Sequence, residues 1–414
     1  DFRHHPAIRT MRGFLPRQPV REHLAVAGDQ SGGSLVAGGF EPEDQHVPPS
    51  IASVRACRRG ANPLRHAGLD PASRATGGGV CGSGCRVGPG MTDKREASGQ
   101  SIRLNVAPSW AIARGMIFRL GTRGSPLALT QAGMTRDALV AAHPGLEVEL
   151  VTVRTTGDRV QDRALAEIGG KALWTKDLDR ALLDGEVDAC VHSMKDVETI
   201  RPAEIAIAAM LPRADVRDRL IGAASIADLP PGAIVGSSSP RRRAQLLRLR
   251  PDLRIILFRG NVDTRLAKLA AGEADATLLA AAGLDRLGRH DTGQAIPIDQ
   301  MLPAPSQAAV GIEVRAGSPA AALVAAIDNA PTSKAVLTER AFLAALGAGC
   351  HSPVGALARI VEGGIGLRAQ LLAEDGSEAV EGEQQGADGA IVAAALARDL
   401  LGRAPESVRR LFGG

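Results

Sequence analysis

The chain has 414 residues, and 49 Lys+Arg against 45 Asp+Glu give it a formal net charge of +4. No uncharged apolar run reaches the ~18 residues that a membrane span needs, and the few cysteines do not suffice for a disulfide scaffold. Aromatic residues make up only 2%, which argues against a stacking platform for single-stranded nucleic acid. We therefore expect a soluble, cytoplasmic protein of about two to three domains that binds neither membranes nor nucleic acid.

The positive charge is concentrated at the N-terminal end. Residues 1–115 contain 15 Lys+Arg and 9 Asp+Glu, whereas the rest of the chain contains 34 and 36. Glycine and proline are frequent in this stretch and no helical or strand period persists, so we expect a non-globular, disordered extension. It lacks the apolar segment of a signal peptide, and its acidic residues argue against a transit peptide.

The first residues suggest an origin for this extension. The sequence begins with Asp1, while Met91 and Met116 both lie just ahead of the first clear strand. Our hypothesis is that much of 1–115 is upstream DNA read through in frame, with the natural start at one of these methionines. Cys81 and Cys85 lack a second ligand pair at zinc-site spacing, so no metal site is predicted.

From Ile117 onward, strand-like runs alternate with helical ones, which is typical of an α/β fold. The predicted elements in chain order are strand 117–123, helix 126–143, strand 148–153, helix 173–183, strands 189–192, 205–210 and 233–235, helix 241–249, strand 254–258, helix 262–271 and strand 276–280. From about residue 332 onward, alternation at 365–371 and a last helix at 389–401 predict a smaller α+β piece.

Two of these units are alike. Each consists of a strand, a Ser-Pro pair and a helix, and the pairs are Ser125-Pro126 and Ser239-Pro240. A serine can cap the free N–H groups of a helix, and proline suits the first helical position. The repeat therefore predicts two similar lobes.

Basic residues gather at these strand ends and helix starts. They are Arg123, Arg241, Arg242, Arg243, Arg259 and Arg265. A single arginine in a first helical turn is often simply solvated, but a repeated cluster opposes the helix dipoles and so favours an anionic ligand. Because arginine pairs bidentately with carboxylates, the sequence predicts a site for a small molecule with several carboxylates or phosphates.

Lys195 and Asp196 follow a short buried strand, where α/β proteins usually place their chemistry. They form either a surface ion pair or, if Asp196 faces a cationic reaction centre, a proton donor and electrostatic stabiliser. Gly169-Gly170-Lys171 lacks the P-loop pattern, so a plain turn and a ligand-binding loop both remain open.

Cys350 lies in a loop of small residues beside His351. Either this thiol is buried and inert, or the small neighbours expose it and His351 lowers its pKa. Cys190 lies in an apolar strand, so we expect it to pack in the core.

Taken together, these segments resemble the porphobilinogen deaminase family. The matching segments are LGTRGSPLALTQA, GGKALWTKDLDRALL, ACVHSMKDV, VGSSSPRRRAQL, FRGNVDTRLAKL, AAAGLDRLG, and TERAFL leading to GAGCHSPVGA. They occur in the family's order and cover the chain from Ile117 to its end, and nothing in 1–115 takes part.

The resemblance implies two lobes built like those of periplasmic binding proteins and a small α+β C-terminal domain. The implied domains are 116–211 with 305–330, 212–304, and the cofactor-attachment domain 331–414. It also implies a transferase, hydroxymethylbilane synthase, that joins four porphobilinogen molecules head to tail in tetrapyrrole biosynthesis and releases ammonia. The chain would grow on a dipyrromethane cofactor held by a thioether, in a monomer without an obligate protein partner.

The resemblance also implies roles for individual residues. By motif position, Cys350 carries the cofactor and Asp196 is the catalytic residue. Further cofactor contacts are implied for Ser125, Lys195, Ser238, Arg241, Arg242, Arg259 and Arg265. Substrate contacts are implied for Arg123, Ser193, Arg286, Lys171, Trp174 and Gln307.

The chain departs from the family pattern at several positions. Gly124 stands where Gln is usual, Trp174 where Phe is usual, and Glu167 where some members have Lys. The usual Gly-Gln-Gly reads Ser306-Gln307-Ala308, which puts a tight backbone approach there in question.

Two alternatives use the same fold. A two-lobed solute receptor would carry a secretory signal and would give Cys350 no role. An inactive paralogue would not need Asp196, Cys350 and the arginines together. We therefore expect an active deaminase.

Overall fold

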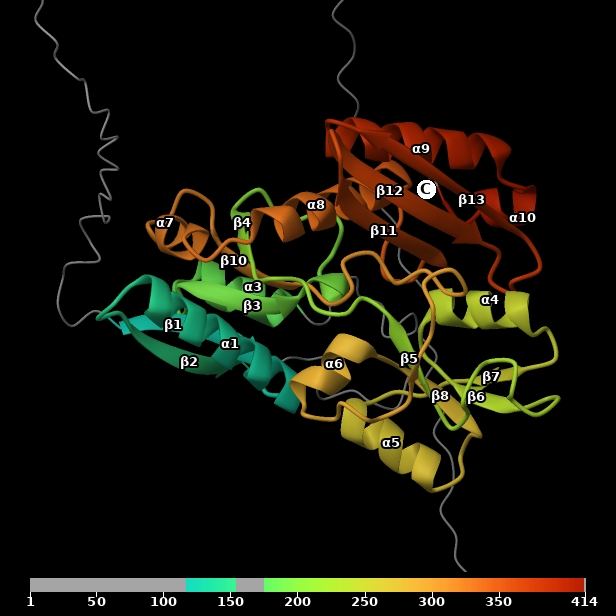
Figure 1. Ribbon diagram of the computed structural model, residues 1–414. Coiled ribbons are helices and arrows are strands. Elements are labelled where there is room, and N and C mark those ends of the chain that lie inside the picture. Colours follow the sequence, from blue (N-terminus) through green and yellow to red (C-terminus); the bar gives the residue numbers. More distant parts are fainter. Residues whose placement is uncertain (1–116, 154–174, 413–414) are drawn as a thin grey trace, which may run out of the picture. The chain divides into compact units, whose positions relative to one another are not determined.

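The computed structural model describes residues 117–153 and 175–412 (Figure 1). All of them belong to one compact unit, 97–414. The disordered extension predicted for 1–115, the Gly169-Gly170-Lys171 segment and Trp174 lie outside the described residues. None of the described helices is long and apolar enough to cross a membrane.

The first sheet has five strands in the order β2-β1-β3-β10-β4. Their bounds are β1 Ile117–Arg123, β2 Glu147–Val153, β3 Ala189–Ser193, β4 Ile205–Met210 and β10 Val310–Arg315. Strand β1 pairs in parallel with β2 and β3, whereas β10 is antiparallel to both of its neighbours. The helices packed against these strands are α1 Pro126–Ala142, α3 Lys176–Leu183 and α7 Ala320–Ala325.

The second sheet repeats this plan in the order β7-β6-β8-β5-β9. Its strands are β5 Asp218–Ile221, β6 Ile234–Gly236, β7 Arg254–Ile256, β8 Ala276–Ala280 and β9 Gln294–Ala295. As in the first sheet, the first three strands in this spatial order, β7, β6 and β8, are parallel. The fourth strand in this order, β5, is antiparallel to both of its neighbours. Its helices are α4 Pro240–Leu249, α5 Val262–Ala270 and α6 Ala281–Arg286.

The two sheets exchange their fourth strands. Strand β5 follows directly after the chain leaves the first sheet at β4, and β10 follows after it leaves the second sheet at β9. The two sheets thus follow the same strand plan with reciprocal crossings, which confirms the predicted pair of similar lobes.

Both Ser-Pro helix starts form as the sequence predicts. The Ser125 side chain accepts a hydrogen bond from the backbone N–H of Ala128 at the start of α1 (3.3 Å). Ser239 does the same for the N–H of Arg242 in α4 (3.4 Å). In both helices, proline occupies a position in the first turn.

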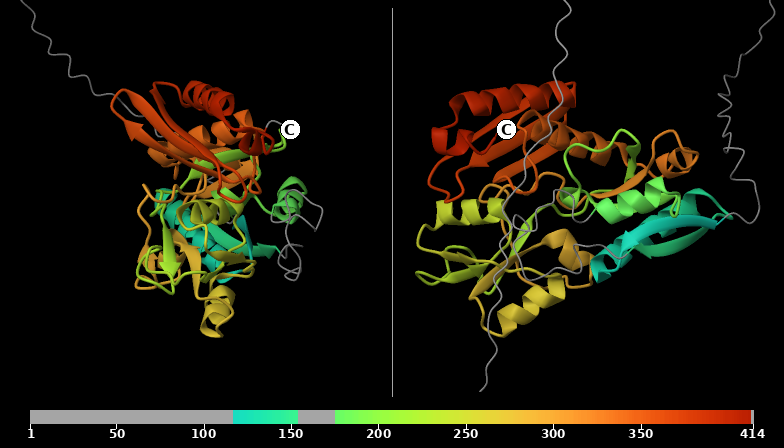
Figure 2. Two further views of the ribbon diagram at one scale, coloured as in Figure 1. Left: turned by 90° about the vertical axis from the view of Figure 1, so that its right-hand side faces the viewer. Right: turned by 180° about the vertical axis from the view of Figure 1, so that it is seen from behind.

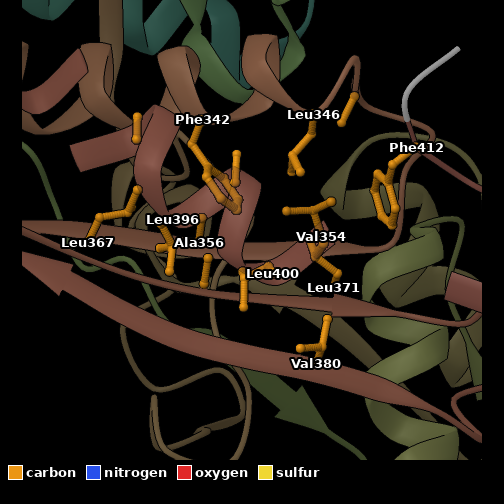
Figure 3. Close-up of a cluster of buried hydrophobic side chains, with 14 of the residues drawn as sticks. Phe342, Leu346, Val354, Ala356, Leu367, Leu371, Val380, Leu396, Leu400 and Phe412 are labelled. Atoms are coloured by element: carbon orange, nitrogen blue, oxygen red, sulfur yellow. The ribbon is translucent and has the colours of Figure 1, made fainter. Parts of the chain in front are cut away.

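The C-terminal piece is a three-stranded antiparallel sheet with helices on one face. Its elements are β11 Val354–Val361, β12 Gly364–Leu372, β13 Ala379–Gly386, α8 Ala330–Ala345, α9 Gly389–Arg403 and α10 Glu406–Arg409. Figure 2 shows α9 along one face of this sheet. Phe342 of α8, Leu396 and Leu400 of α9, and Leu367 and Leu371 of β12 form its buried core (Figure 3). The expectation of a small α+β piece is confirmed.

Most predicted elements are present, with small shifts at their ends. The strands predicted at 205–210 and 276–280 agree with β4 and β8 to the residue. The elements that were not predicted from the sequence include both antiparallel fourth strands, β5 and β10, and the long helix α8.

Candidate active site

A cavity of about 940 Å³ is lined by residues of both lobes and of the C-terminal piece. Most predicted site residues lie on its wall: Arg123, Ser125, Ser193, Lys195, Asp196, Ser238, Arg241, Arg242, Arg259, Arg265, Gln307 and Cys350. A second, smaller cavity shares Arg123, Ser125, Ser193 and Asp196 with the first. Residues that are far apart in the sequence are therefore brought to one site.

Arg286 lies differently from its predicted neighbours. It is not among the residues that line the large cavity. Its Nη2 donates a hydrogen bond to the carbonyl oxygen of Ala308 (2.7 Å), and burial lowers the pKa of its guanidinium. The side chain thus contacts the segment that leads back into the first lobe. Lys171 and Trp174 lie outside the described residues.

Asp196 is positioned by a short 3-10 turn, Met194–Asp196, at the end of β3. Met194 is buried, and a Cβ at Gly311 of β10 would lie 2.1 Å from its sulfur. A side chain at 311 would force Met194 to shift, so glycine at this position lets the turn pack closely against the sheet. Asp196 itself is exposed and lines the cavity.

Two carboxylates occur among the described residues that line this cavity, those of Asp196 and Asp263. Asp263 is paired with Arg289 at 2.6 Å. No described residue donates a hydrogen bond to the carboxylate of Asp196, although Arg265 and Lys195 lie near enough for its charge to act on them. Asp196 is therefore the carboxylate of the cavity wall whose oxygens are available to a ligand.

Lys195 contributes a charge that is easily lost. Burial is the main reason why the pKa of its ammonium group is lowered to about 8; Arg242 and Arg241 act in the same direction, while Asp196 and Asp218 oppose the shift. Its Nζ lies 3.5 Å from Oε1 of Gln307. Lys195 is therefore a cation near neutral pH and becomes neutral in mild alkali.

Arg241 and Arg242 are both buried, and both bind Asp218 of β5. Arg241 Nη2 donates to Oδ2 of Asp218 (2.7 Å), and Arg242 Nη2 donates to Oδ1 (2.6 Å). Burial alone would raise the pKa of Asp218, but the two guanidinium charges hold it well below its usual range. Asp218 is a site component that sequence reasoning missed.

Three guanidinium nitrogens of the site have no hydrogen-bond partner among the described residues. They are Nε of Arg241, Nε of Arg242 and Nη1 of Arg259, and all three are buried. Arg265 donates to the Ser238 hydroxyl (3.3 Å), and burial lowers the pKa of its guanidinium to about 10. The cationic side chains gathered on the cavity wall fit a ligand that carries several carboxylates.

Cys350 lies in the loop after α8, is exposed, and lines the cavity. The expectation that His351 lowers its pKa is wrong. Loss of hydration raises the pKa of the thiol, and the negative charges of Asp196 and Glu198 add to this effect. The negative charge of Asp196, the predicted catalytic residue, therefore acts on the thiol of Cys350, the predicted attachment point of the cofactor. Cys190 is buried in the core as predicted.

Helix α8 connects the C-terminal piece to the site through Glu339, which is fully buried. Its carboxylate accepts two hydrogen bonds from Arg213 (2.8 and 3.0 Å), one from the N–H of Ser306 (2.6 Å) and one from the N–H of Ala358 (2.8 Å). The next residue, Arg340, donates to the carbonyl oxygens of Val197 (3.3 Å) and Thr199 (3.1 Å). The segment TERAFL, which carries part of the family resemblance, lies in this helix, but nothing in its sequence reveals what its charges bind.

The segment Ser306-Gln307-Ala308 adopts the backbone for which glycine is suited. Ser306 has φ = 65° and Ala308 has φ = 72°, both in the left-handed region. Serine and alanine therefore occupy left-handed positions that glycine would adopt without strain.

The fold and the site define a two-lobed α/β protein whose cavity, lined by several arginines, fits a ligand with several carboxylates. Residues 118–322 match the family model described as "Porphobilinogen deaminase, dipyromethane cofactor binding domain", and residues 333–402 match "Porphobilinogen deaminase, C-terminal domain". The porphobilinogen deaminase of Sphingopyxis alaskensis is 58% identical over 305 residues, which cover 71% of this chain and 96% of that protein. That of Paracoccus denitrificans is 51% identical over 70% of this chain and 95% of its own length. The chloroplastic protein of Oryza sativa is 46% identical over 67% of this chain and 80% of its own.

The chain belongs to the porphobilinogen deaminase family. It is a transferase of tetrapyrrole biosynthesis that condenses porphobilinogen into linear hydroxymethylbilane on a dipyrromethane cofactor. The alternative of a solute receptor without chemistry is thereby excluded.

Proposed function

We propose that this activity is carried out in the large cavity, with Asp196 as the acid/base and electrostatic residue and Cys350 as the attachment point of the cofactor. The observation that supports this most is the placement of both side chains on one cavity wall, with Asp196 accepting no hydrogen bond from the described residues. The dipyrromethane, when bound, supplies the pyrrole carbon to which substrate is joined.

The remaining polar residues bind and orient. Each porphobilinogen carries two carboxylates, so a growing chain needs many cations in one cavity. Arg241, Arg242 and Arg259 bring positive charge to these carboxylates, and Arg123 and Arg265 extend the cationic wall. Ser125, Ser193 and Ser238 supply hydroxyl groups on the same wall. Arg286 acts from outside the wall, through its contact with Ala308.

Asp196 serves two needs of the reaction. Loss of ammonia from porphobilinogen leaves positive charge spread over the substrate ring, and a carboxylate close by stabilises that charge. The same group can give a proton to the departing amine and later accept the proton lost from the joined pyrrole. Covalent attachment at Cys350 keeps each addition effectively intramolecular.

The finer organisation belongs to the same proposal. The three sheets support a division into 116–211 with 305–330, 212–304, and 331–414. The low number of cysteines supports a cytoplasmic location. The family resemblance supports a monomer that needs no protein partner.

Replacing Asp196 tests its role directly. Asp196→Ala should retain the attached cofactor by intact mass but lose about a hundredfold or more in turnover, because proton transfer and charge stabilisation are both removed. The matched control is Asp263→Ala, which removes the other cavity carboxylate, already paired with Arg289. Near-normal turnover of Asp196→Ala would refute the assignment.

A further inference from the structure

One buried carboxylate serves two arginines of the site. Asp218 is 3% exposed and begins β5, outside the helix that carries the arginines. Oδ2 accepts from Arg241 Nη2, and Oδ1 accepts from Arg242 Nη2 and from Gln307 Nε2 (3.0 Å). Each guanidinium is further fixed by a carbonyl: Arg241 Nη1 donates to Leu302 (2.7 Å) and Arg242 Nη1 to Leu278 (2.9 Å).

This arrangement offsets an unfavourable charge pattern. Two adjacent cations in the first turn of α4 repel each other and oppose the helix dipole. A single carboxylate between them offsets this cost and leaves a net positive charge of one. It also takes the Nη2 atoms and leaves both Nε atoms without a partner among the described residues, on side chains that line the cavity.

Gln307 extends the arrangement to the first lobe. Its Nε2 donates to Asp218 and to the carbonyl of Val216 (2.8 Å), while its Oε1 lies 3.5 Å from Nζ of Lys195. Lys195 precedes Asp196 in the same turn. The polar atoms thus form a continuous path from the arginine pair of α4 to the turn that carries the catalytic candidate.

We propose that Asp218 is a positioning residue for the condensation: its carboxylate holds Arg241 and Arg242 in the orientation in which they bind ligand carboxylates, and Gln307 joins this pair to Lys195. The inference rests on the proposed function, because the arginines must bind the cofactor or substrate for their orientation to matter. Residues that orient binding groups in this way are commonly as sensitive to substitution as the groups themselves.

The first test is Asp218→Asn, which keeps the size of the side chain and removes its charge. We expect a smaller fraction of purified protein carrying the cofactor by intact mass, and a fall of about tenfold or more in kcat/KM. The matched control is Asp215→Asn, which removes a nearby Asp–Arg pair, Asp215–Arg217 (2.7 Å), whose two residues do not line the cavity. This variant should resemble the wild type.

A pH profile separates positioning from a merely structural role. The charged groups that act on Lys195 are Asp196, Asp218, Arg241 and Arg242. Loss of the Asp218 charge removes an attraction that favours the ammonium form, so the pKa of Lys195 falls further. The alkaline limb of kcat/KM should therefore move to lower pH in Asp218→Asn and stay in place in Asp215→Asn.

A second pair of variants serves if Asp218→Asn does not fold. The double variant Asp218→Asn/Arg241→Gln keeps the buried net charge of the cluster unchanged and is compared with Arg241→Gln alone. The proposal predicts lower cofactor occupancy in the double variant, since Arg242 has lost its partner. The proposal would be overturned if cofactor occupancy and kcat/KM were the same in Asp218→Asn and Asp215→Asn, or the same in the double variant and Arg241→Gln. This comparison requires that the wild type prepared alongside is active. A wild type without cofactor or turnover would overturn the proposed function as well.

Discussion

The two lobes have the same strand order, but the buried carboxylate on the fourth strand has a different role in each lobe. Strands β10 and β5 occupy the same place in their sheets, and each carries one buried carboxylate, Glu313 or Asp218. Glu313 binds Arg201 through both oxygens (2.8 and 2.9 Å) and lies 3.2 Å from Nε2 of His192. Arg201 does not line the large cavity, whereas both arginine partners of Asp218 do.

The difference shows how one architecture serves two purposes. In the first lobe, the buried carboxylate ties the segment after the Asp196 turn to the sheet, because Arg201 also binds Asp179 and Glu198. In the second lobe, it orients cations toward a ligand. Substitutions at Glu313 should therefore lower mainly the stability of the fold, whereas substitutions at Asp218 should lower mainly binding and catalysis.

The largest expected effect is on stability, from Glu313→Ala. Removing one partner of a buried charge cluster leaves Arg201 uncompensated and should cost about 3–5 kcal/mol in the free energy of unfolding. Urea unfolding followed by circular dichroism measures this loss. The kcat/KM of the folded fraction should fall far less than in Asp218→Asn, and an equal fall in both would remove the distinction between the lobes.

Acid stability should depend on the same residue. Burial raises the pKa of Glu313, but the contact with His192 and the charge of Arg201 outweigh it and lower the pKa to about 2. The unfolded state then binds more protons than the folded state as pH falls from the ordinary value for Glu toward 2, so stability is lost across this window. The loss amounts to about 3 kcal/mol, since one pKa unit is worth about 1.4 kcal/mol. Urea midpoints between pH 5 and 2 should be clearly less pH-dependent in Glu313→Gln, and an unchanged slope would contradict the pKa.

A smaller effect concerns Lys195, which lies between the lobes. Burial lowers the pKa of its ammonium group to about 8. The cationic fraction drops about tenfold per pH unit above the pKa, so kcat/KM should fall about tenfold between pH 7 and 9. In Lys195→Met this limb should disappear from a lower starting activity. A limb that persists in the variant belongs to another group.

The smallest effect is expected where the chain returns to the first lobe. Ala308→Gly relieves a left-handed alanine, which costs about 1–2 kcal/mol, but loses part of this gain to the greater freedom of glycine in the unfolded chain. We expect a net gain of about 0.5–1 kcal/mol in urea unfolding. Ala309→Gly, at a buried residue without positive φ, is the control and should lose stability. A loss in both variants would show that φ at 308 carries no strain.

The sequence was sufficient where a local pattern determines the structure. The Ser-Pro helix starts, strand β4 and strand β8 follow from capping chemistry and apolar runs, and they form as predicted. Strand β5 was missed because it has only four residues and begins with a buried carboxylate, Asp218. Strand β10, VGIEVR, alternates apolar and polar residues, so its pattern could have been recognised in the sequence.

Contacts between segments that are distant in the sequence could not be predicted from local sequence patterns. The partners of Asp218 and of Glu339 come from other elements, and nothing in their local sequence reveals them. The thiol of Cys350 illustrates the same limit. Its neighbour in sequence, His351, suggested a lowered pKa, but loss of hydration and the spatial neighbour Asp196 raise it.

The central claim is that Cys350 holds the cofactor of this enzyme, and the most direct test is intact mass with peptide mapping after incubation with porphobilinogen. We expect an added mass of two linked pyrroles on the peptide that contains Cys350. The addition should be lost in Cys350→Ser and kept in Cys190→Ala, which alters the buried thiol of the first lobe. An unmodified Cys350 after incubation, or the same mass on a different peptide, would show that Cys350 does not hold the cofactor.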